Sequence, residues 1–138
     1  MRRLLSVVVS VYNEEEALAQ FYQVTEGILN TISWDYELVF VNDGSRDQSL
    51  PILNHLADSN PKVKVVSFSR NFGHEAAMIA GIDYSQGDGI ICMDADLQHP
   101  PACIPEIIRR FEDGYEVINM VRTKNESAGW FKNMASSA

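Results

Sequence analysis

Short, almost unbroken apolar runs recur along the chain. Five of them are rich in valine, isoleucine or leucine, and they cover residues 4–11, 37–42, 63–69, 89–93 and 115–121. Runs of this length and composition predict β-strands. Because they are nearly continuous rather than alternating with polar residues, they indicate a sheet that is covered on both faces.

The segments between these runs carry helical patterns with recognisable ends. Helices are predicted over residues 14–29, 47–58, 74–84 and 105–113. Asn13 is placed to cap the first helix, with Glu16 at the capping-box position, and Asp47 is placed to cap the second. Pro105 in the first turn and Gly114 after the end suit the last helix. Because strands and helices alternate, we expect an α/β domain with a mostly parallel sheet flanked by helices.

Composition and charge narrow the chemistry. The 138 residues fit one domain, 46% of them are hydrophobic, and the formal net charge is −8. This charge argues against a general nucleic-acid surface. It also means that a phosphorylated ligand needs a metal ion or local cations at its site.

The two cysteines and the absence of targeting patterns bear on the setting of the chain. Cys92 and Cys103 form no C-x-x-C pair, which argues against a disulfide framework or a zinc site and fits a reducing, cytosolic setting. Cys92 lies in an apolar run and is predicted to be a buried thiol. The sequence shows no signal-peptide pattern and no run of about 18 apolar residues.

Polar residues follow every predicted strand directly. In chain order these positions hold Tyr12, Asn13 and Glu14, then Asp43, then Arg70 and Asn71, then Asp94, Asp96 and Gln98, and finally Arg122. In an open parallel sheet the carboxyl ends of the strands meet at one edge, and ligands bind there, close to the point where the strand order reverses. Five polar clusters at one edge therefore predict a polar crevice for a ligand.

Asp94 and Asp96, which flank Ala95 after the fourth predicted strand, are the sharpest chemical signal. Two carboxylates at this spacing can converge on a hard divalent cation, and Mg²⁺ or Mn²⁺ often combines one or two carboxylates with substrate phosphates. Such an ion joins a diphosphate to an acidic protein and stabilises a departing nucleoside diphosphate. Gln98 can add an oxygen ligand. The alternative for an isolated Asp-x-Asp is a solvated turn, which the position after a buried strand makes less favourable.

The other polar positions have both a binding and a structural interpretation. Asp43 can accept hydrogen bonds from a base or ribose, or form the turn of Asp-Gly-Ser. Tyr12 and Glu14 can hold the ribose or base, or help to begin a helix. Arg70 and Arg122 can meet phosphates through charge-assisted hydrogen bonds, or be solvated surface charges.

His74, His99 and the glycine residues do not point to a particular function. His74 can act in acid–base chemistry or, as we favour, simply begin a helix. His99 can border the metal site, and neither histidine is assigned a catalytic role. No G-x-G-x-x-G follows the first predicted strand, and no G-x-x-x-x-G-K-[ST] occurs anywhere. A dinucleotide dehydrogenase and a P-loop NTPase are therefore disfavoured.

Four segments, taken in order, resemble those of a known enzyme family. The chain resembles family 2 glycosyltransferases of the GT-A fold, especially the polyprenyl-phosphate branch, in SVVVSVYNEEEAL, VFVNDGSRDQS, SRNFGHEAAMIAGIDYSQGD and CMDADLQHPP. The resemblance covers nearly all of residues 4–133. It implies a Rossmann-like nucleotide-diphospho-sugar transferase fold, a UDP- or GDP-sugar donor, Mg²⁺ or Mn²⁺ as cofactor, and a polyprenyl phosphate as acceptor.

The resemblance also implies roles for individual residues. Donor-nucleotide contacts are implied for Ser10, Tyr12, Glu14, Val41, Asp43, Arg70, Asp94 and Ala95. Among these, Val41 is expected to line the pocket and Ala95 to contribute its backbone. Metal ligation is implied for Asp94, Asp96 and Gln98. Catalytic roles are implied for Asp96 and for Arg122, the latter at a donor or acceptor phosphate. Ser10 stands where the family usually has proline.

The same resemblance implies that residues 1–138 are the nucleotide-sugar-binding part of a truncated GT-A domain. The catalytic base and the acceptor and membrane region of the family come later in the sequence, so we expect this chain alone to be a weak or inactive catalyst. Exposed apolar surface near Trp130 and Phe131 would favour a homo-oligomer. The full-length enzyme is expected at the cytoplasmic face of the membrane, with inversion at the anomeric carbon achieved by positioning and electrostatics.

Two other enzyme classes fit the sequence less well. A sugar nucleotidyltransferase would need a glycine-rich loop where Tyr12, Asn13 and Glu14 stand. A phosphatase of the haloacid type carries its Asp-x-Asp after the first strand, whereas here it follows the fourth. A catalytically incomplete nucleotide-binding module and a glycosyltransferase with a saccharide acceptor stay open as alternatives.

Overall fold

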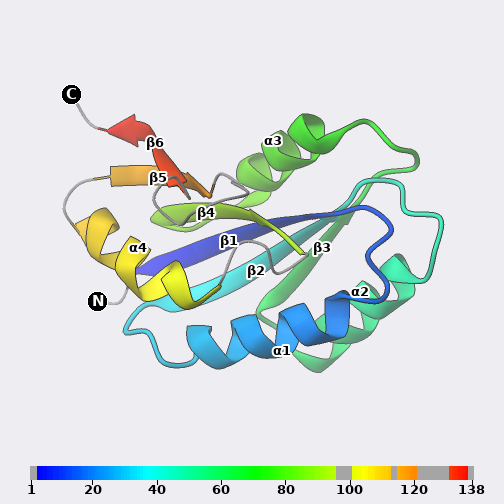
Figure 1. Ribbon diagram of the computed structural model, residues 1–138, viewed down its shortest axis with the longest axis horizontal. Helices are drawn as coiled ribbons and strands as arrows, with labels where there is room; N and C mark the ends of the chain where they lie inside the picture. The colour runs from blue at the N-terminus through cyan, green and yellow to red at the C-terminus, as the bar shows by residue number, and fades with distance from the viewer. Residues whose placement is uncertain (1–2, 96–100, 113–114, 121–130, 137–138) are drawn as a thin grey trace, which may run out of the picture.

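A six-stranded sheet runs through the middle of the protein. The computed structural model describes residues 3–95, 101–112, 115–120 and 131–136. The strands are β1 (Leu4–Val11), β2 (Asp35–Asn42), β3 (Val63–Ser67), β4 (Gly89–Asp94), β5 (Tyr115–Met120) and β6 (Phe131–Ser136). They lie in the order β3-β2-β1-β4-β5-β6, parallel from β1 to β5, with β6 antiparallel to β5 (Figure 1). The predicted mostly parallel α/β sheet is confirmed, with β6 as an addition that the apolar pattern did not show.

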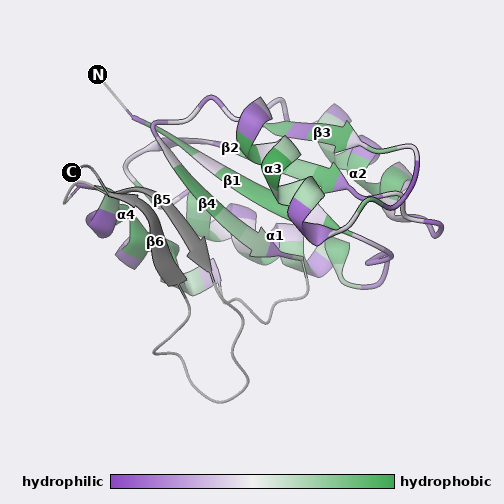
Figure 2. Ribbon diagram, turned by 90° about the horizontal axis from the view of Figure 1, so that it is seen from above, coloured by the Kyte–Doolittle hydropathy of each residue, from purple (hydrophilic) through white to green (hydrophobic). Residues whose placement is uncertain are grey.

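Helices cover both faces of this sheet. The described residues form α1 (Leu18–Leu29), α2 (Ser49–Ser59), α3 (His74–Tyr84) and α4 (Ile104–Glu112), the last preceded by a short 3₁₀ turn, η1 (Pro101–Cys103). The α1, α2 and α4 helices pack on one face, and α3 packs on the other (Figure 1). Figure 2 shows the apolar residues of β1, β2 and β4 lying between these layers.

The core divides into two clusters because neighbouring strand residues point to opposite faces. Val7 and Val9 belong to the larger cluster beneath α1, α2 and α4, whereas Val8 belongs to the cluster beneath α3. The α3 helix lies so close to the sheet that a Cβ on Gly81 would stand 2.3 Å from Cγ1 of Val8. Close packing of this kind fixes the C-terminal half of α3 on the sheet.

The first predicted helix begins later than expected. It begins at Leu18, its N-cap residue is Ala17, and no side chain caps it. Asn13 instead takes a positive φ of 55°, and its Oδ1 accepts a hydrogen bond from the Arg46 backbone N–H at 2.8 Å. The predicted cap at Asn13 and the capping box at Glu16 are therefore wrong, because the asparagine side chain joins two loops instead.

The predicted N-cap of the second helix is also wrong. Its N-cap residue is Gln48, not Asp47, and the helix has no side-chain cap. The Asp47 carboxylate accepts hydrogen bonds from the backbone N–H groups of Ser49 at 2.8 Å and Glu15 at 3.1 Å. Glu15 in turn accepts a bond from the Gln48 N–H at 2.8 Å. The loops after β1 and β2 are thus interlocked by side chains that the sequence pattern assigned to helix ends.

Other boundaries differ by a few residues. β2 begins two residues before the predicted position, and β3 ends at Ser67 rather than at residue 69. The α3 helix has the predicted bounds. The Cys92 thiol is buried as predicted, and burial raises its pKa to about 12. None of the described helices is both long and apolar enough to cross a lipid bilayer.

A buried carboxylate stabilises the amino-terminal end of the sheet. One oxygen of Glu37 accepts hydrogen bonds from the Ser6 hydroxyl at 2.6 Å and the Gln86 backbone N–H at 2.8 Å, and the other faces Lys64 Nζ at 3.3 Å. Burial by itself raises the pKa of Glu37, but the bonds from Gln86, Ser6 and Lys64 outweigh it and lower the pKa below its usual value. The ionised form is therefore the one that stabilises the fold.

This network gives a pH-dependent prediction. Because the pKa of Glu37 is lower in the folded than in the unfolded state, its contribution is present at neutral pH and is lost as the pH falls through the folded pKa. Glu37→Gln should lower the free energy of unfolding by about 1–3 kcal/mol at pH 7. The difference from the wild type should shrink in urea titrations carried out at progressively lower pH. A difference that stays constant from neutral to acid would contradict this role.

Candidate functional site

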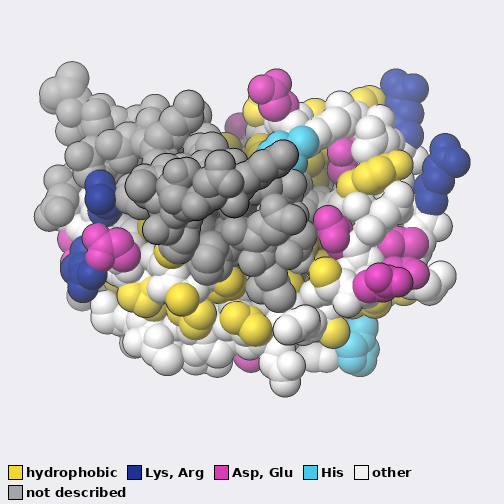
Figure 3. Space-filling view, in the orientation of Figure 1, with side chains coloured by type: hydrophobic (Ala, Val, Ile, Leu, Met, Phe, Trp, Pro, Cys, Tyr) yellow, Lys and Arg dark blue, Asp and Glu magenta, His cyan; other side chains and the backbone are white. Residues whose placement is uncertain are grey.

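The strand order reverses between β1 and β4. From β1 the chain builds outward through β2 and β3 on one side, and through β4 and β5 on the other. The loops after β1, β2 and β3 and the end of β4 therefore gather at the carboxyl edge of the sheet, toward the right in Figure 1. Figure 3 shows acidic and basic side chains together at this end of the molecule. Ligands of open parallel sheets bind in this position.

Asp94 is the last residue of β4 and lies at the reversal point. It is aligned with Ser10 of β1, whose hydroxyl donates to Asp94 Oδ1 at 3.3 Å. The same oxygen lies 2.8 Å from Nε2 of His74, the first residue of α3. The Asp94 side chain is 17% exposed. The structure thus brings one predicted metal ligand together with Ser10, and adds a histidine from another element.

Asp43 directly follows β2 and is buried. It is 3% exposed, and its carboxylate accepts hydrogen bonds from Asn71 Nδ2 at 3.0 Å and from the backbone N–H groups of Phe72 at 2.8 Å and Gly73 at 3.1 Å. A further bond joins Asn71 Nδ2 to the Asp43 carbonyl at 3.1 Å. The carboxylate therefore holds the loop between β3 and α3, which also carries Arg70.

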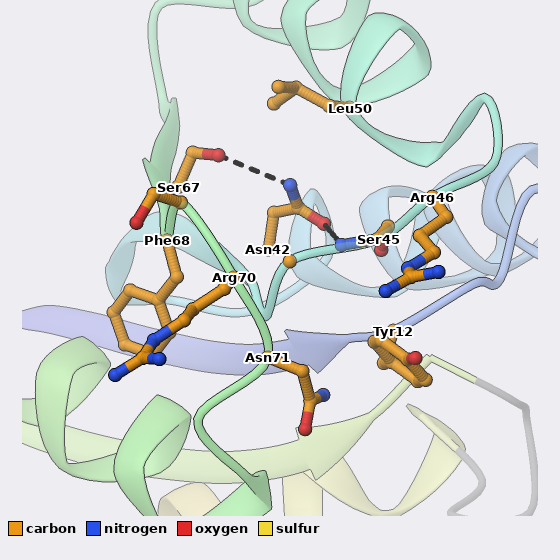
Figure 4. Close-up of a pocket in the computed structure, with 11 residues that line it drawn as sticks. Tyr12, Asn42, Ser45, Arg46, Leu50, Ser67, Phe68, Arg70 and Asn71 are labelled. Carbon is orange, nitrogen blue, oxygen red and sulfur yellow. Dashed lines mark hydrogen bonds between the residues drawn. The ribbon is translucent and has the colours of Figure 1, made fainter.

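A pocket of about 370 Å³ opens at the ends of β2 and β3. It is lined by Tyr12, Asn42, Gly44, Ser45, Arg46, Leu50, Ser67, Phe68, Ser69, Arg70 and Asn71 (Figure 4). The Asn42 amide fixes its wall, because it donates to Ser67 Oγ at 3.1 Å and accepts from the Ser45 N–H at 3.2 Å. This volume lies within the range of small-ligand pockets.

Tyr12 and Arg70 are two of the residues that line this pocket. Tyr12 comes from the loop after β1 and is 44% exposed. Arg70 comes from the loop after β3, and its guanidinium stacks over the Phe72 ring at 4.7 Å from the centroid. A planar ring and a held guanidinium suit a ligand that combines a flat heterocycle with negative charge.

The remaining predicted residues divide into three groups. Val41 is fully buried beneath α3, so the expectation that its side chain lines the pocket is not met. Ala95 is also fully buried. Glu14 is half-buried, and its N–H donates to Ser49 Oγ at 2.9 Å. Outside the described residues lie Asp96, Gln98, His99 and Arg122.

Two residues of the site were not assigned to it from the sequence. Arg46 lines the pocket, and His74 contacts Asp94. Both follow strands that end at the same edge, which was the available signal. Asn71, which the sequence placed at this edge, also lines the pocket. His74 was interpreted chiefly as the start of a helix, since its spacing from Asp94 does not show that the two side chains meet.

Gly44 is needed where the loops after β2 and β3 touch. Its φ is +72°, and a Cβ there would lie 2.3 Å from the carbonyl carbon of Arg70. Gly44→Ala should therefore lower the free energy of unfolding by about 1–3 kcal/mol or more, through strain and overlap. Chemical denaturation against Gly27→Ala tests this, because Gly27 lies inside α1 with open space at its Cβ. The control should be neutral or slightly stabilising; equal destabilisation of both variants would contradict the prediction.

The described part of the site offers one ligand of the kind that hard cations prefer. Within the ranges that the structure covers, no three His, Cys, Asp or Glu side chains converge on a common point. Asp94 nevertheless presents a partly exposed carboxylate at the reversal point. This fits Mg²⁺ or Mn²⁺, which need only one or two carboxylates when phosphate oxygens complete the coordination.

Comparison with known proteins identifies the class. Residues 6–138 match the family described as glycosyl transferase family 2, and the chain belongs to that family. Its fold is GT-A: it aligns with the mannosyltransferase PcManGT from Pyrobaculum calidifontis, solved in complex with GDP-Man and Mn²⁺, with a TM-score of 0.58 and 21% identity over 70% of this chain and 28% of that one.

Two curated relatives show closer sequence similarity. The chain is 46% identical over 132 residues to an uncharacterized glycosyltransferase, YkcC, of Bacillus subtilis (strain 168), covering 96% of this chain and 41% of the relative. It is 42% identical over 135 residues to a prophage bactoprenol glucosyl transferase homolog of Escherichia coli (strain K12), covering 92% and 44%. The chain therefore spans less than half the length of these relatives.

Proposed function

We propose that residues 1–138 form the donor-binding part of a glycosyltransferase that moves a sugar from a UDP- or GDP-sugar to a polyprenyl phosphate. The observation that supports this proposal most strongly is the position of Asp94, which lies where the strand order reverses. Tyr12 and Arg70 line a pocket at the same edge of the sheet. The relative described as a bactoprenol glucosyl transferase homolog supports the acceptor class. The neighbour solved with GDP-Man and Mn²⁺ supports the donor class.

In this proposal the donor nucleoside binds in the pocket at the ends of β2 and β3. Tyr12 offers its exposed ring to the base or ribose, and Arg70 offers its guanidinium to a base carbonyl or a phosphate. Asp43 acts through Asn71, which it holds in the pocket wall. Ser10, Glu14 and the backbone of Ala95 are proposed to complete the nucleotide contacts along the same edge.

The diphosphate is placed toward Asp94. We assign Mg²⁺ or Mn²⁺ to Asp94, Asp96 and Gln98, and when bound the ion supplies Lewis-acid stabilisation of the leaving nucleoside diphosphate. Asp96 and Arg122 are the proposed catalytic residues, with Arg122 at a donor or acceptor phosphate.

The reaction proposed is a single displacement with inversion. An oxygen of the acceptor phosphate forms a bond to the anomeric carbon while the bond from that carbon to the diphosphate breaks. A phosphate oxygen is already nucleophilic, so the contribution of this chain is chiefly to hold and orient the donor. The acceptor residues are placed in the part of the relatives that this chain does not cover, and the whole enzyme is placed at the cytoplasmic face of the membrane.

A panel of nucleotides tests this function. UDP-glucose, UDP-GlcNAc, GDP-mannose and ADP-glucose should be screened by thermal unfolding with Mn²⁺ and with EDTA. At about 100 times its dissociation constant a donor adds about 2.7 kcal/mol of stability, which raises the Tm of a domain of this size by several degrees. We expect such a rise for at least one UDP- or GDP-sugar, and only with Mn²⁺. No rise with any nucleotide sugar would contradict the function.

A further inference from the structure

His74 is joined to the carboxylate that the proposed function assigns to the metal. Its Nε2 lies 2.8 Å from Asp94 Oδ1, so the contact links the first residue of α3 to the last residue of β4. The imidazole is 59% exposed and the carboxylate 17%. The pair therefore lies at the carboxyl edge of the sheet and is accessible to solvent, rather than buried in the core.

The backbone that carries His74 is held from the opposite side of the site. The N–H groups of Phe72 and Gly73 donate to the Asp43 carboxylate, and Gly73 adopts a φ of +110° that lets the loop turn into α3. Tight packing at Gly81 then fixes the helix on the sheet. The backbone on either side of His74 is therefore held in place, and this fixes where the imidazole meets Asp94. An ordinary ion pair at the surface does not require such a fixed backbone.

The contacts restrict the Asp94 carboxylate itself. Ser10 Oγ and His74 Nε2 approach the same oxygen, Oδ1, from β1 and from α3. Two partners on one oxygen, from two elements, limit rotation of the carboxylate group. A ligand that is already oriented loses less freedom when it binds a cation, and hydrogen bonds to ligating groups commonly change metal affinity by about 10–100-fold.

From this geometry we infer that His74 is a positioning residue, which orients Asp94 to receive a divalent cation together with a nucleoside diphosphate. The inference rests on the proposed function, because it takes Asp94 as a metal ligand. His74 acts through its hydrogen bond to Asp94 and does not itself bind the cation. Its removal should therefore weaken metal-dependent binding while leaving the nucleoside contacts in place.

Electron paramagnetic resonance of Mn²⁺, titrated into the chain with UDP or with GDP, tests this. His74→Ala should raise the Mn²⁺ dissociation constant about 10-fold or more. His74→Gln retains an amide donor at a comparable reach and should stay within about 3-fold of the wild type, below the loss of about 10–100-fold expected when the hydrogen bond is removed. His55→Ala, a change of an exposed histidine on α2, should have no effect. Binding of uridine or guanosine without metal should be the same in all four proteins.

The possible results separate this inference from the proposed function. Equal Mn²⁺ affinity in His74→Ala and the wild type would overturn the role of His74 alone. Two other results would also overturn it. A His74→Gln variant as weak as His74→Ala would show that a hydrogen-bond donor at this position is not sufficient. Imidazole-nitrogen coupling to Mn²⁺ in the wild type would show that His74 is a direct ligand. Failure of the wild type to bind Mn²⁺ with either diphosphate would overturn the proposed function, and this inference with it.

Discussion

Asp43→Ala is expected to lower both the stability of the chain and its affinity for a nucleoside. The change removes a buried carboxylate that accepts bonds from Asn71, Phe72 and Gly73. The two backbone N–H groups would lose their partner, and the free energy of unfolding should fall on the order of 3 kcal/mol. Since Asn71 and Arg70 belong to the loop that is released, the pocket wall should loosen as well.

Two measurements on the same variant check this. Urea denaturation gives the stability, and calorimetry below the Tm of the variant gives the affinities for nucleoside, nucleoside diphosphate and inorganic pyrophosphate. Nucleoside and nucleoside diphosphate should both bind about 10-fold or more weakly, as expected when about 1.4 kcal/mol of binding free energy is lost. Asp58→Ala, which removes an exposed carboxylate from α2, is the matched control. Equal loss of pyrophosphate binding, or unchanged stability, would contradict the assigned role.

Asp94→Ala is expected to abolish most of the metal-assisted binding of a nucleoside diphosphate. The structure places this carboxylate at the strand reversal, with Ser10 and His74 on its Oδ1. Removing a ligand should exceed the effect of removing its hydrogen-bond partner, so we expect a loss of about 100-fold or more in affinity with Mn²⁺ present. Stability should change little, because His74 is largely exposed and can be solvated by water.

Calorimetry with UDP and with GDP, each in Mn²⁺ and in EDTA, separates the metal-dependent part of the binding affinity from the rest. In EDTA the variant and the wild type should bind alike, and in Mn²⁺ only the wild type should gain affinity. Asp96→Ala should behave in the same way if both aspartates hold the ion. Equal affinity of wild type and Asp94→Ala in Mn²⁺ would remove Asp94 from the metal site.

Apolar runs were sufficient to predict the parallel strands and the architecture. Their continuity follows from burial on both faces, a property that each strand shows by itself. The β6 strand was missed because FKNMAS is not a continuous apolar run, and its antiparallel pairing with β5 has no signature in the local apolar pattern. The place of β6 in the sheet therefore could not be predicted from the sequence pattern.

Polar residues were harder to assign because they serve more than one purpose. Asn13 and Asp47 have the right type and spacing for helix caps, yet their side chains bond to neighbouring loops. Asp43 lies at the predicted edge, but its burial could not be deduced without the loop that covers it. The contact of His74 with Asp94 depends on how α3 packs, which a spacing of 20 residues does not reveal.

The most direct test is calorimetric titration of the wild-type chain with UDP-glucose and with GDP-mannose, each in Mn²⁺ and in EDTA. If Asp94 lies in a metal site next to a nucleoside pocket, one of the two donors should bind with a dissociation constant of about 1 mM or lower in Mn²⁺, near the upper end of ordinary substrate affinities. The same donor should bind at least about 100-fold more weakly in EDTA, a loss of about 2.8 kcal/mol. No binding of either donor in Mn²⁺, or the same affinity with and without the metal, would contradict a metal-dependent donor site in this chain.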